Sequence, residues 1–354
     1  MYPTIEINTA GILQNLHTLK ALAAEQGIRI SMVTKGFVGY APLVKFLTEN
    51  GADSICEAHF QNLKKYEDYE AEKWMIRPPM ISQAAEVVRY ADVSLNSEYE
   101  TIRALSAEAI RQGRKHKVVI MTELGETREG IMPADLVPLC EAITKLSGIE
   151  LYGIGNNLSC YSEIIPDDEN MGLFTQLVHD VEAAVGFKLP IVSGGNTSSV
   201  YKLQRRELPK EINHLRIGEA IIIGNIACYN EPVRGGSSDN LTLSAEIIEI
   251  KEKPSAPYGS RVQGVVPAAQ DPRFPDRGIR KRALIAVGKQ DVDIYHLKPH
   301  DAGIEVLGGC SDCFVADITD CEKKYSVGDV VQFTMNYYSM LSGMSSEYIE
   351  KILV

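Results

Sequence analysis

Three absences narrow the class of protein that this 354-residue sequence encodes. The formal net charge is −11, so the chain lacks the basic surface that binds phosphates, and we expect no nucleic-acid partner. No apolar run is long enough to cross a bilayer, so we expect no membrane partner. The first residues lack a basic region followed by an apolar run, which predicts the absence of a secretory signal.

A disulfide framework is also missing. The seven cysteines are an odd number and are scattered along the chain, which favours a reduced, cytoplasmic setting. Cys310 and Cys313 have the two-residue gap of redox and zinc motifs, but the sequence holds no second such pair. Residues 314–318 predict a strand, whereas a thioredoxin-type motif opens a helix. We therefore expect no metal site and no redox function at this pair.

From residue 4 to residue 218, short apolar segments alternate with segments of helical periodicity. Strands are predicted at residues 4–7, 30–34, 54–56, 74–76, 93–95, 117–121, 151–155, 189–193 and 215–218. Such alternation implies a parallel sheet, and about eight repeats imply a closed (β/α)8 TIM barrel, with a doubly wound open sheet as the alternative. Ser97 and Glu100 predict a capping box at the start of one helix.

Composition changes near residues 231–239, and the helical periodicity then disappears. Strands are predicted at residues 242–250, 261–266, 282–287, 306–307, 314–318 and 329–335. With 45% hydrophobic residues the chain has enough apolar material for two domains. We expect residues 1–230 to form the barrel and residues 231–354 a C-terminal β-domain, with which the first strand, residues 4–7, is a candidate to pair.

Lys35 stands at the C-terminal end of a predicted strand and is followed by a glycine. It is either a lysine that extends to the rim of the sheet or an amine that forms a Schiff base with a carbonyl cofactor. Functional groups of a barrel lie at the C-terminal ends of its strands, which favours the second interpretation.

Residues 193–199, with the sequence SGGNTSS, combine backbone amides, hydroxyls and a helix start. Such a segment is either a Gly-Ser-rich turn or a phosphate cradle, and phosphate sites of barrels usually lie at late strands. A Schiff-base lysine together with a phosphate cradle fits pyridoxal 5′-phosphate (PLP) as the cofactor.

Seven segments occur in a specific order and spacing over nearly the whole chain. They are residues 33–35 (VTK), 123–130 (ELGETREG), 155–158 (GNNL), 193–198 (SGGNTS), 215–220 (LRIGEA), and 311–312 (SD) with 336–337 (NY). In these segments the chain resembles the fold-type III PLP enzymes of the alanine racemase superfamily, and within it the ornithine-racemase-like amino acid racemases. The resemblance implies an isomerase that interconverts L- and D-amino acids by removing and returning the Cα proton.

The resemblance also implies functions for individual residues. Lys35 matches the lysine that holds PLP and moves the Cα proton on one face, and Arg216 matches the arginine opposite the pyridine nitrogen. A permanent cation there disfavours a protonated ring, which weakens the electron sink and favours return of the proton to Cα. The other implied cofactor contacts are Arg128, Asn157, Thr197, Ser198, Gly218, Glu219 (through its backbone) and Tyr337, and Tyr40 lies near the position of a further tyrosine.

Two of these matches have qualifications. Asn157 stands where many members of the superfamily have a ring-stacking histidine. Arg128 matches an arginine near the cofactor's phenolic oxygen and the substrate carboxylate, but a surface ion pair with Glu126 or Glu129 is the alternative.

Racemisation needs a second acid–base group on the opposite face of Cα. The resemblance implies a tyrosine that the partner subunit of a head-to-tail homodimer supplies to a shared active site, and Tyr258 is the candidate here. Cys310, Asp312 and Cys313 lie in the segment that resembles the substrate-facing loop and are alternatives.

The resemblance favours ornithine or a related basic amino acid as the substrate, with small neutral amino acids as alternatives. Loop carboxylates that are candidates to accept a side-chain cation are Glu126, Glu129, Asp291, Asp293 and Asp312. Three other functions compete. A non-catalytic PLP-binding or homeostasis protein would not need the second domain, a fold-type III decarboxylase would have a carboxylate in place of Arg216, and a barrel enzyme without a cofactor would leave the phosphate cradle unexplained.

Overall fold

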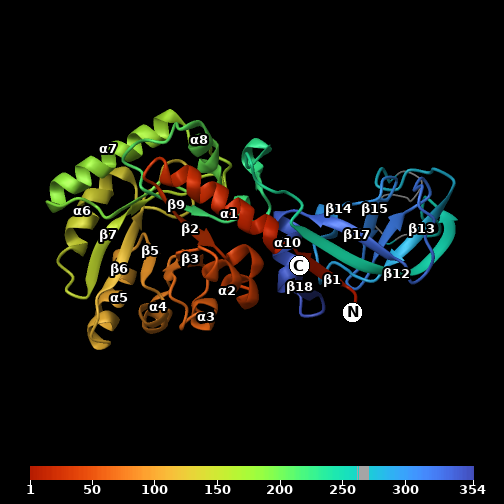
Figure 1. Cartoon of the computed structure of the whole chain (residues 1–354), viewed down its shortest axis with the longest axis horizontal. Coiled ribbons are helices and arrows are strands. Elements are labelled where there is room, and N and C mark those ends of the chain that lie inside the picture. The colour runs from red at the N-terminus through yellow and green to blue at the C-terminus, as the bar shows by residue number, and fades with distance from the viewer. Residues whose placement is uncertain (261, 263–270) are drawn as a thin grey trace. The chain divides into compact units, whose positions relative to one another are not determined.

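The computed structural model describes residues 1–260, 262 and 271–354 (Figure 1). The chain forms two compact units. One consists of residues 9–238, and the other combines residues 1–8 with residues 239–354. The N-terminal strand therefore belongs to the same unit as the C-terminal third of the chain.

A closed barrel of eight parallel strands forms the centre of the first unit. In chain order the strands are β2 (Arg29–Val33), β3 (Ser54–Glu57), β4 (Glu72–Met75), β5 (Val93–Asn96), β6 (His116–Met121), β7 (Ile149–Gly155), β8 (Ile191–Ser193) and β9 (His214–Ile217). Each strand pairs with the next, and Met32 of β2 pairs with Ile217 of β9 to close the ring. The predicted TIM barrel is confirmed, and the open sheet is excluded.

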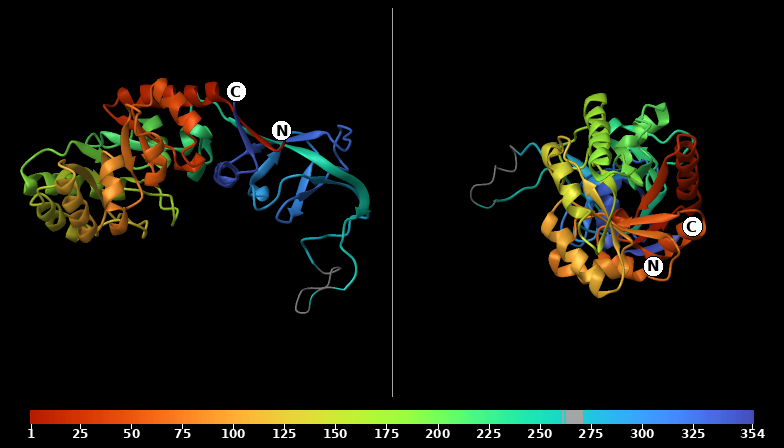
Figure 2. Two further views of the ribbon diagram at one scale, coloured as in Figure 1. Left: turned by 90° about the horizontal axis from the view of Figure 1, so that it is seen from below. Right: turned by 90° about the vertical axis from the view of Figure 1, so that its left-hand side faces the viewer.

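Helices follow the strands and surround the barrel (Figure 2). They are α1 (Thr9–Ala24), α2 (Ala41–Glu49), α3 (Phe60–Lys65), α4 (Ala84–Tyr90), α5 (Tyr99–Arg111), α6 (Pro133–Ile143), α7 (Asp168–Val185), α8 (Val200–Arg205) and α9 (Glu219–Ile222). Their apolar residues at helical spacing face the barrel, as in α1, where Ile12, Leu16 and Leu19 are at most 1% exposed. This burial, more than propensity, stabilises such short helices.

The capping box predicted at Ser97 is wrong. Helix α5 begins after Glu98, whose side chain makes no capping hydrogen bond. A capping box does begin α7, where Asp167 accepts from the Asn170 amide and Asn170 accepts in return. Both are Asx residues, whereas residues 97–100 have the serine–glutamate form of the motif.

Apolar side chains fill the inside of the barrel. The cluster comprises Val33, Cys56, Trp74, Val93, Leu95, Val119, Met121 and Ile191. The Trp74 ring stacks on the His214 imidazole with a centroid distance of 4.6 Å and an interplanar angle of 14°. Strands β7 and β8 approach closely at Gly153, where a Cβ atom would lie 1.9 Å from the carbonyl oxygen of Ile191.

The boundary between the units falls after residue 238, not after the expected residue 230. Strands β10 (Asn225–Ile226) and β11 (Glu231–Pro232) pair with each other in the barrel unit. The Asn15 side chain of α1 accepts from the Ser237 amide at 2.6 Å and donates to the Ser237 carbonyl at 2.8 Å. These contacts join residues 231–238 to the barrel unit.

A mostly antiparallel sheet forms the second unit, which is the predicted C-terminal β-domain. Its strands are β1 (Thr4–Ile7), β12 (Leu241–Pro254), β13 (Ile279–Ile285), β14 (Leu297–Pro299), β15 (Glu305–Gly309), β16 (Phe314–Asp317), β17 (Val330–Met335) and β18 (Glu350–Leu353), with helix α10 (Tyr337–Ser345) between the last two. Strand β1 pairs antiparallel with β12 and parallel with β18. The strand predicted at residues 261–266 lies outside the described residues.

No helix within the described ranges combines the length and the apolar character that crossing a membrane requires.

Replacing Gly153 with alanine tests the close approach of β7 and β8. Because the new methyl group would overlap a backbone carbonyl that cannot rotate away, we expect Gly153→Ala to lower the free energy of unfolding by at least about 2 kcal/mol. Urea unfolding followed by circular dichroism measures the change. Gly172→Ala is the matched control: Gly172 lies in α7 with nothing within 4 Å of its Cβ position, so alanine should stabilise by about 0.5–1 kcal/mol. Equal effects of the two changes would contradict the close approach.

Candidate active site

Lys35 begins the short 3-10 helix η1 (Lys35–Phe37). One residue separates this helix from the C-terminal end of β2. The turn that follows is tightly fixed. Val38 and Gly39 both have φ of 55°, and the Tyr66 hydroxyl donates to the Gly39 carbonyl at 2.6 Å. A Cβ atom on Gly39 would lie 2.1 Å from that hydroxyl oxygen, so glycine is required there. The backbone that carries Lys35 therefore has one well-defined conformation.

The Lys35 side chain is half-buried. Its ammonium group forms no hydrogen bond or ion pair with any residue that the structure describes. A partly buried amine without an acceptor is available for covalent bonding to a carbonyl group, or for carrying a proton.

A buried carboxylate that the sequence analysis did not single out anchors the residue before Lys35. Thr34 Oγ1 donates to Glu57 Oε2 at 2.9 Å, and the Ala58 amide donates to Glu57 Oε1 at 2.7 Å. Glu57 is fully buried, and this burial raises the pKa of its carboxyl group despite the hydrogen bonds that oppose the shift. The signal in the sequence was a single acidic residue at the end of a short apolar strand.

Arg216 lies in β9 and is 3% exposed. Its Nη1 donates to the Ser193 hydroxyl, and its Nη2 donates to the Asn156 carbonyl at 2.7 Å. Within the described part of the chain, no carboxylate pairs with it. Burial lowers the pKa of the guanidinium, but the ordinary value is so high that the group stays a cation. A buried cation without a counter-ion costs stability and indicates a functional position.

A buried hydrogen-bond chain fixes the hydroxyl that Arg216 contacts. Ser193 Oγ lies 2.8 Å from His214 Nδ1, His214 Nε2 lies 2.7 Å from Ser31 Oγ, and Ser31 Oγ lies 2.6 Å from Ser54 Oγ. Burial, and secondarily the charge of Arg216, lower the pKa of His214 well below its ordinary value, so the imidazole is neutral. The chain joins β2, β3, β8 and β9 and gives the Arg216 guanidinium a fixed orientation.

Two short helices begin after the neighbouring strands β8 and β9: η3 (Thr197–Ser199) and α9. The first amides of these helices, at Thr197 and Glu219, have no acceptor within their own helix. Thr197 Oγ1 accepts from the Ala220 amide at 3.3 Å and so joins the two helix starts. The buried Ser198 hydroxyl has no partner among the described residues, and Gly218 precedes α9 without a side chain. These donors suit a phosphate group.

Asn157 lies after β7 and contacts the loop after β8. The Asn196 amide donates to Asn157 Oδ1 at 3.0 Å and to the Leu158 carbonyl at 2.7 Å. The Asn157 Nδ2 atom is buried without a hydrogen-bond partner in the described part of the chain. It is a second polar atom at this end of the barrel that is available to a ligand.

The charged side chains of the loop after β6 interact with groups of that loop and of the loop after β7. Arg128 forms an ion pair with Glu129, with Nη2 donating to Oε1 at 2.7 Å, so the alternative of a surface ion pair is present in this structure. Glu126 is 2% exposed and accepts from the amides of Ser159 at 3.0 Å and Cys160 at 2.6 Å. Its carboxylate therefore orders the loop after β7.

Neighbouring groups also engage two of the acidic residues in the C-terminal unit. Asp291 accepts from a serine hydroxyl at 2.9 Å, and Asp293 lies 2.7 Å from the imidazole of His296. Asp312 differs, since the contact that the structure gives its carboxylate is the hydroxyl of the preceding serine at 3.4 Å. Of the five loop carboxylates considered as cation acceptors, Asp312 is the least engaged.

Of the predicted proton carriers and cofactor contacts, the C-terminal unit holds Tyr258, Asp312 with its alternatives Cys310 and Cys313, and Tyr337. Tyr258 lies in the loop after β12 and is 87% exposed. Asp312 is exposed in the turn between β15 and β16, and Tyr337 begins α10 with its ring edge-on to Tyr338 at a centroid distance of 6.2 Å. The barrel unit holds the others, including Lys35.

Comparisons with known proteins agree with this arrangement. The family model "Alanine racemase, N-terminal domain" matches residues 7–225. The chain is 40% identical to an ornithine racemase of Acetoanaerobium sticklandii over 100% of both chains, and 36% identical to a lysine racemase of Thermotoga maritima over 99% of this chain and 98% of the relative. Its fold is similar to that of Bartonella henselae alanine racemase with covalently bound pyridoxal phosphate (TM-score 0.74, 16% identity, 99% of each chain).

The fold and these matches define a racemase-type barrel enzyme with a C-terminal β-domain. The chain belongs to the alanine racemase family. Within that family it is an amino acid racemase, an isomerase, and the predicted function class is confirmed.

Burial raises the pKa of the Glu219 side chain to about 7, which predicts a pH-dependent stability. Between pH 4.5 and about 7, the folded chain keeps a proton that the unfolded chain has released. The stabilisation from the neutral carboxyl is therefore complete below the unfolded pKa and is lost as the pH rises through 7. Glu219→Gln, which stays neutral, should gain stability relative to the unsubstituted chain as the pH rises from about 5 to about 8, measured by urea unfolding.

Glu207→Gln, at an exposed position of the same unit, is the control for the loss of one carboxylate. Parallel pH profiles for Glu219→Gln would show that this carboxyl is not perturbed.

Proposed function

We propose that this racemase holds PLP on Lys35 and acts on ornithine or a related basic amino acid. When bound, PLP supplies an electron sink for the charge that develops at Cα after the proton leaves. The observation that carries the proposal is Arg216, a buried cation that hydrogen bonds to Ser193 and Asn156 fix and that has no carboxylate partner among the described residues.

The donors of the barrel unit fit the cofactor. The Ser198 hydroxyl and the Asn157 Nδ2 atom are buried and lack partners among the described residues, and the helix starts at Thr197 and Glu219 supply backbone amides. We assign Thr197, Ser198, Gly218 and the Glu219 backbone to the phosphate, together with Tyr337. Asn157 and Arg128 are assigned to the ring, and Arg128 would also meet the substrate carboxylate after leaving Glu129.

The chain's own residues divide the proton transfer between two faces of the substrate. Lys35 carries the proton on one face, since its amine has no competing acceptor in the described structure. Arg216 would disfavour a proton on the ring nitrogen of a bound cofactor because two neighbouring cations repel each other, which would favour return of the proton to Cα over side reactions.

Tyr258 is the proposed proton carrier on the other face, and Asp312 is the second candidate. An 87% exposed tyrosine on a loop fits a group that completes the active site of a second subunit. We therefore propose a head-to-tail homodimer with shared active sites.

Two relatives that match over the full length of the chain are named ornithine racemase and lysine racemase, which supports a basic amino acid as the substrate.

All seven cysteines are free, which supports the reduced, cytoplasmic setting expected from their number.

Replacing Lys35 with alanine tests the covalent attachment of the cofactor. We expect the purified Lys35→Ala variant to lose the visible absorbance of the lysine-bound cofactor, and its exchange of the substrate Cα proton with deuterated water to fall by at least about 10²–10⁴-fold. Absorbance spectroscopy and mass spectrometry measure the two effects. Lys45→Ala, at an exposed lysine of α2, should behave as the unsubstituted chain. Full exchange by Lys35→Ala would overturn the proposal.

Mixing two inactive variants tests the shared active site. Lys35→Ala and Tyr258→Phe each remove one proton carrier, and random exchange of subunits gives hybrid dimers in which one of two sites is intact. We expect racemisation to recover to about a quarter of the unsubstituted rate. No recovery in a mixture shown to contain hybrids would contradict a site completed by Tyr258 of a second subunit.

Initial rates of Cα deuterium exchange test the substrate. Ornithine, lysine, arginine and alanine are supplied as separate L-enantiomers, and we expect ornithine or lysine to exchange fastest. Fastest exchange of alanine would contradict the proposed substrate and leave the proposed chemistry intact.

A further inference from the structure

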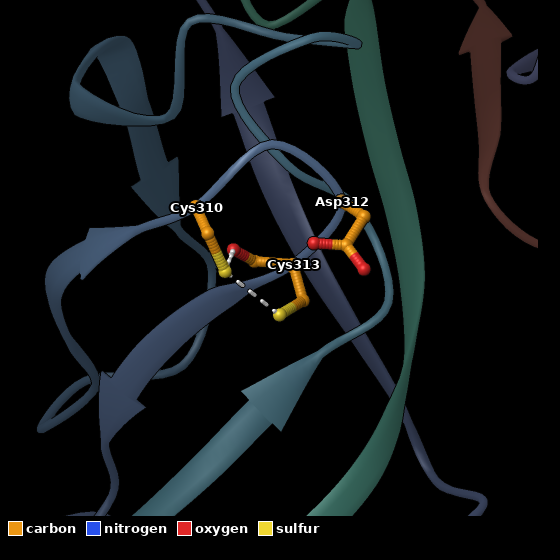
Figure 3. A group of neighbouring side chains, drawn as sticks. All are labelled: Cys310, Asp312 and Cys313. Atoms are coloured by element: carbon orange, nitrogen blue, oxygen red, sulfur yellow. Dashed lines mark hydrogen bonds between the residues drawn. The ribbon is translucent and has the colours of Figure 1, made fainter.

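The turn between β15 and β16 brings together three side chains of types that can ligate a metal: Cys310, Asp312 and Cys313 (Figure 3). The Sγ atoms of Cys310 and Cys313 lie 3.3 Å apart. Together with a carboxylate oxygen of Asp312, these ligand atoms all lie within 4.8 Å of one another. Cys310 and Asp312 are exposed, so the group is accessible from solvent.

The glycines before the turn determine where Cys310 points. The ladder between β15 and β16 shifts register between Val306 and Gly308, and Gly308 has φ of 149°. A Cβ atom on Gly309 would lie 2.6 Å from the Cβ of Phe314, so the hairpin closes tightly just before the turn. The Cys310 amide donates to the Cys313 carbonyl at 2.9 Å. Residues paired in this way project their side chains from the same face of a hairpin.

A second loop fixes the turn from outside. The Lys289 amide donates to the Cys310 carbonyl at 2.9 Å, and the Gln290 amide donates to the Ser311 carbonyl at 2.9 Å. A Cβ atom on Gly288 would lie 2.1 Å from the Ser311 carbonyl oxygen, so a side chain there would push the turn away. The Lys289 ammonium lies 5.0 Å from the ring centre of Tyr295. The turn is therefore ordered before any ligand arrives.

We propose that Cys310, Asp312 and Cys313 bind one thiophilic divalent cation, with Zn²⁺ as the ion to test. Tetrahedral Zn²⁺ bonds to sulfur at about 2.3 Å, which places two thiolates about 3.8 Å apart. The observed separation of 3.3 Å needs only a small opening of the pair. The carboxylate is the third ligand, and water completes the tetrahedron.

Charge and protons balance in this binding step. Each thiol releases one proton to solvent as its sulfur bonds to the cation, while the Asp312 carboxylate binds without a proton change. Two thiolates and one carboxylate leave the site with a single negative charge after a dication binds.

A cation bound at this turn determines which residue is available as the second proton carrier, and this consequence rests on the proposed function. A carboxylate and two thiolates that ligate a cation are not available to exchange protons with a substrate. Binding at the turn therefore leaves Tyr258 as the second proton carrier. The cation site itself depends only on the geometry of the turn.

Cobalt substitution in the full-length holoenzyme tests the site. Under anaerobic, reducing conditions we expect one equivalent of Co²⁺ to give visible ligand-field bands at wavelengths beyond the cofactor's absorbance, and Zn²⁺ to abolish them. The double variant Cys310→Ser/Cys313→Ser should lose the bands. Asp312→Asn should bind Co²⁺ at least about 100-fold more weakly, because replacing even a residue that only hydrogen-bonds to a metal ligand lowers metal affinity by about 10–100-fold. Cys228→Ser, at an exposed cysteine of the barrel unit, should keep the bands.

Alkylation provides a second readout that does not depend on the cofactor. Zn²⁺ should protect Cys310 and Cys313 from iodoacetamide, as followed by peptide mass spectrometry, while Cys228 in the same sample reacts at an unchanged rate. Circular dichroism verifies that each variant is folded. Absence of tight binding, bands that persist in the double cysteine variant, or full affinity of Asp312→Asn would overturn the three-ligand site. None of these outcomes depends on whether the chain racemises amino acids.

Discussion

A buried, unpaired positive charge is the constraint on which the catalytic end of the barrel depends. Arg216 is 3% exposed, and in the part of the chain that the structure describes it bonds to a hydroxyl and a carbonyl instead of a carboxylate. Such an arrangement is stable when neutral acceptors surround the cation completely and when their own orientation is fixed. The chain through Ser193, His214 and Ser31 meets this requirement by using polar side chains inside an otherwise apolar barrel.

The same network explains why the barrel interior is not uniformly apolar. His214 stacks on Trp74 and bonds at both ring nitrogens, so its burial as a neutral group costs little. Glu57, at the end of β3, also orients a site element. Its carboxylate accepts a hydrogen bond from Thr34 and so fixes the start of η1. Strand β9 carries Arg216 and the short helix after β2 carries Lys35, so these two groups lie at defined places in the barrel unit.

Much of the barrel could be predicted because each strand is buried on both faces, so short apolar runs and helical spacers carry the signal. Strand β18 and helix α10 were not predicted, since the strand depends on pairing with residues 4–7, far away in the chain. Lys35 and Arg216 were found from their places at strand ends and from a resemblance. Glu57 and His214 were missed because a single polar residue in an apolar strand has no local pattern, and the partner of His214 at Ser31 is 183 positions distant.

The pairing of β1 with both β12 and β18 has a consequence for the order in which the protein forms during synthesis. Strand β1 leaves the ribosome before any barrel strand, yet its neighbours are made after the barrel sequence is complete. The barrel strands follow one another in the chain and have all been synthesised by residue 217. Ile5 and Ile7, both fully buried in the finished fold, therefore face solvent throughout that period and form an aggregation-prone segment on the nascent chain.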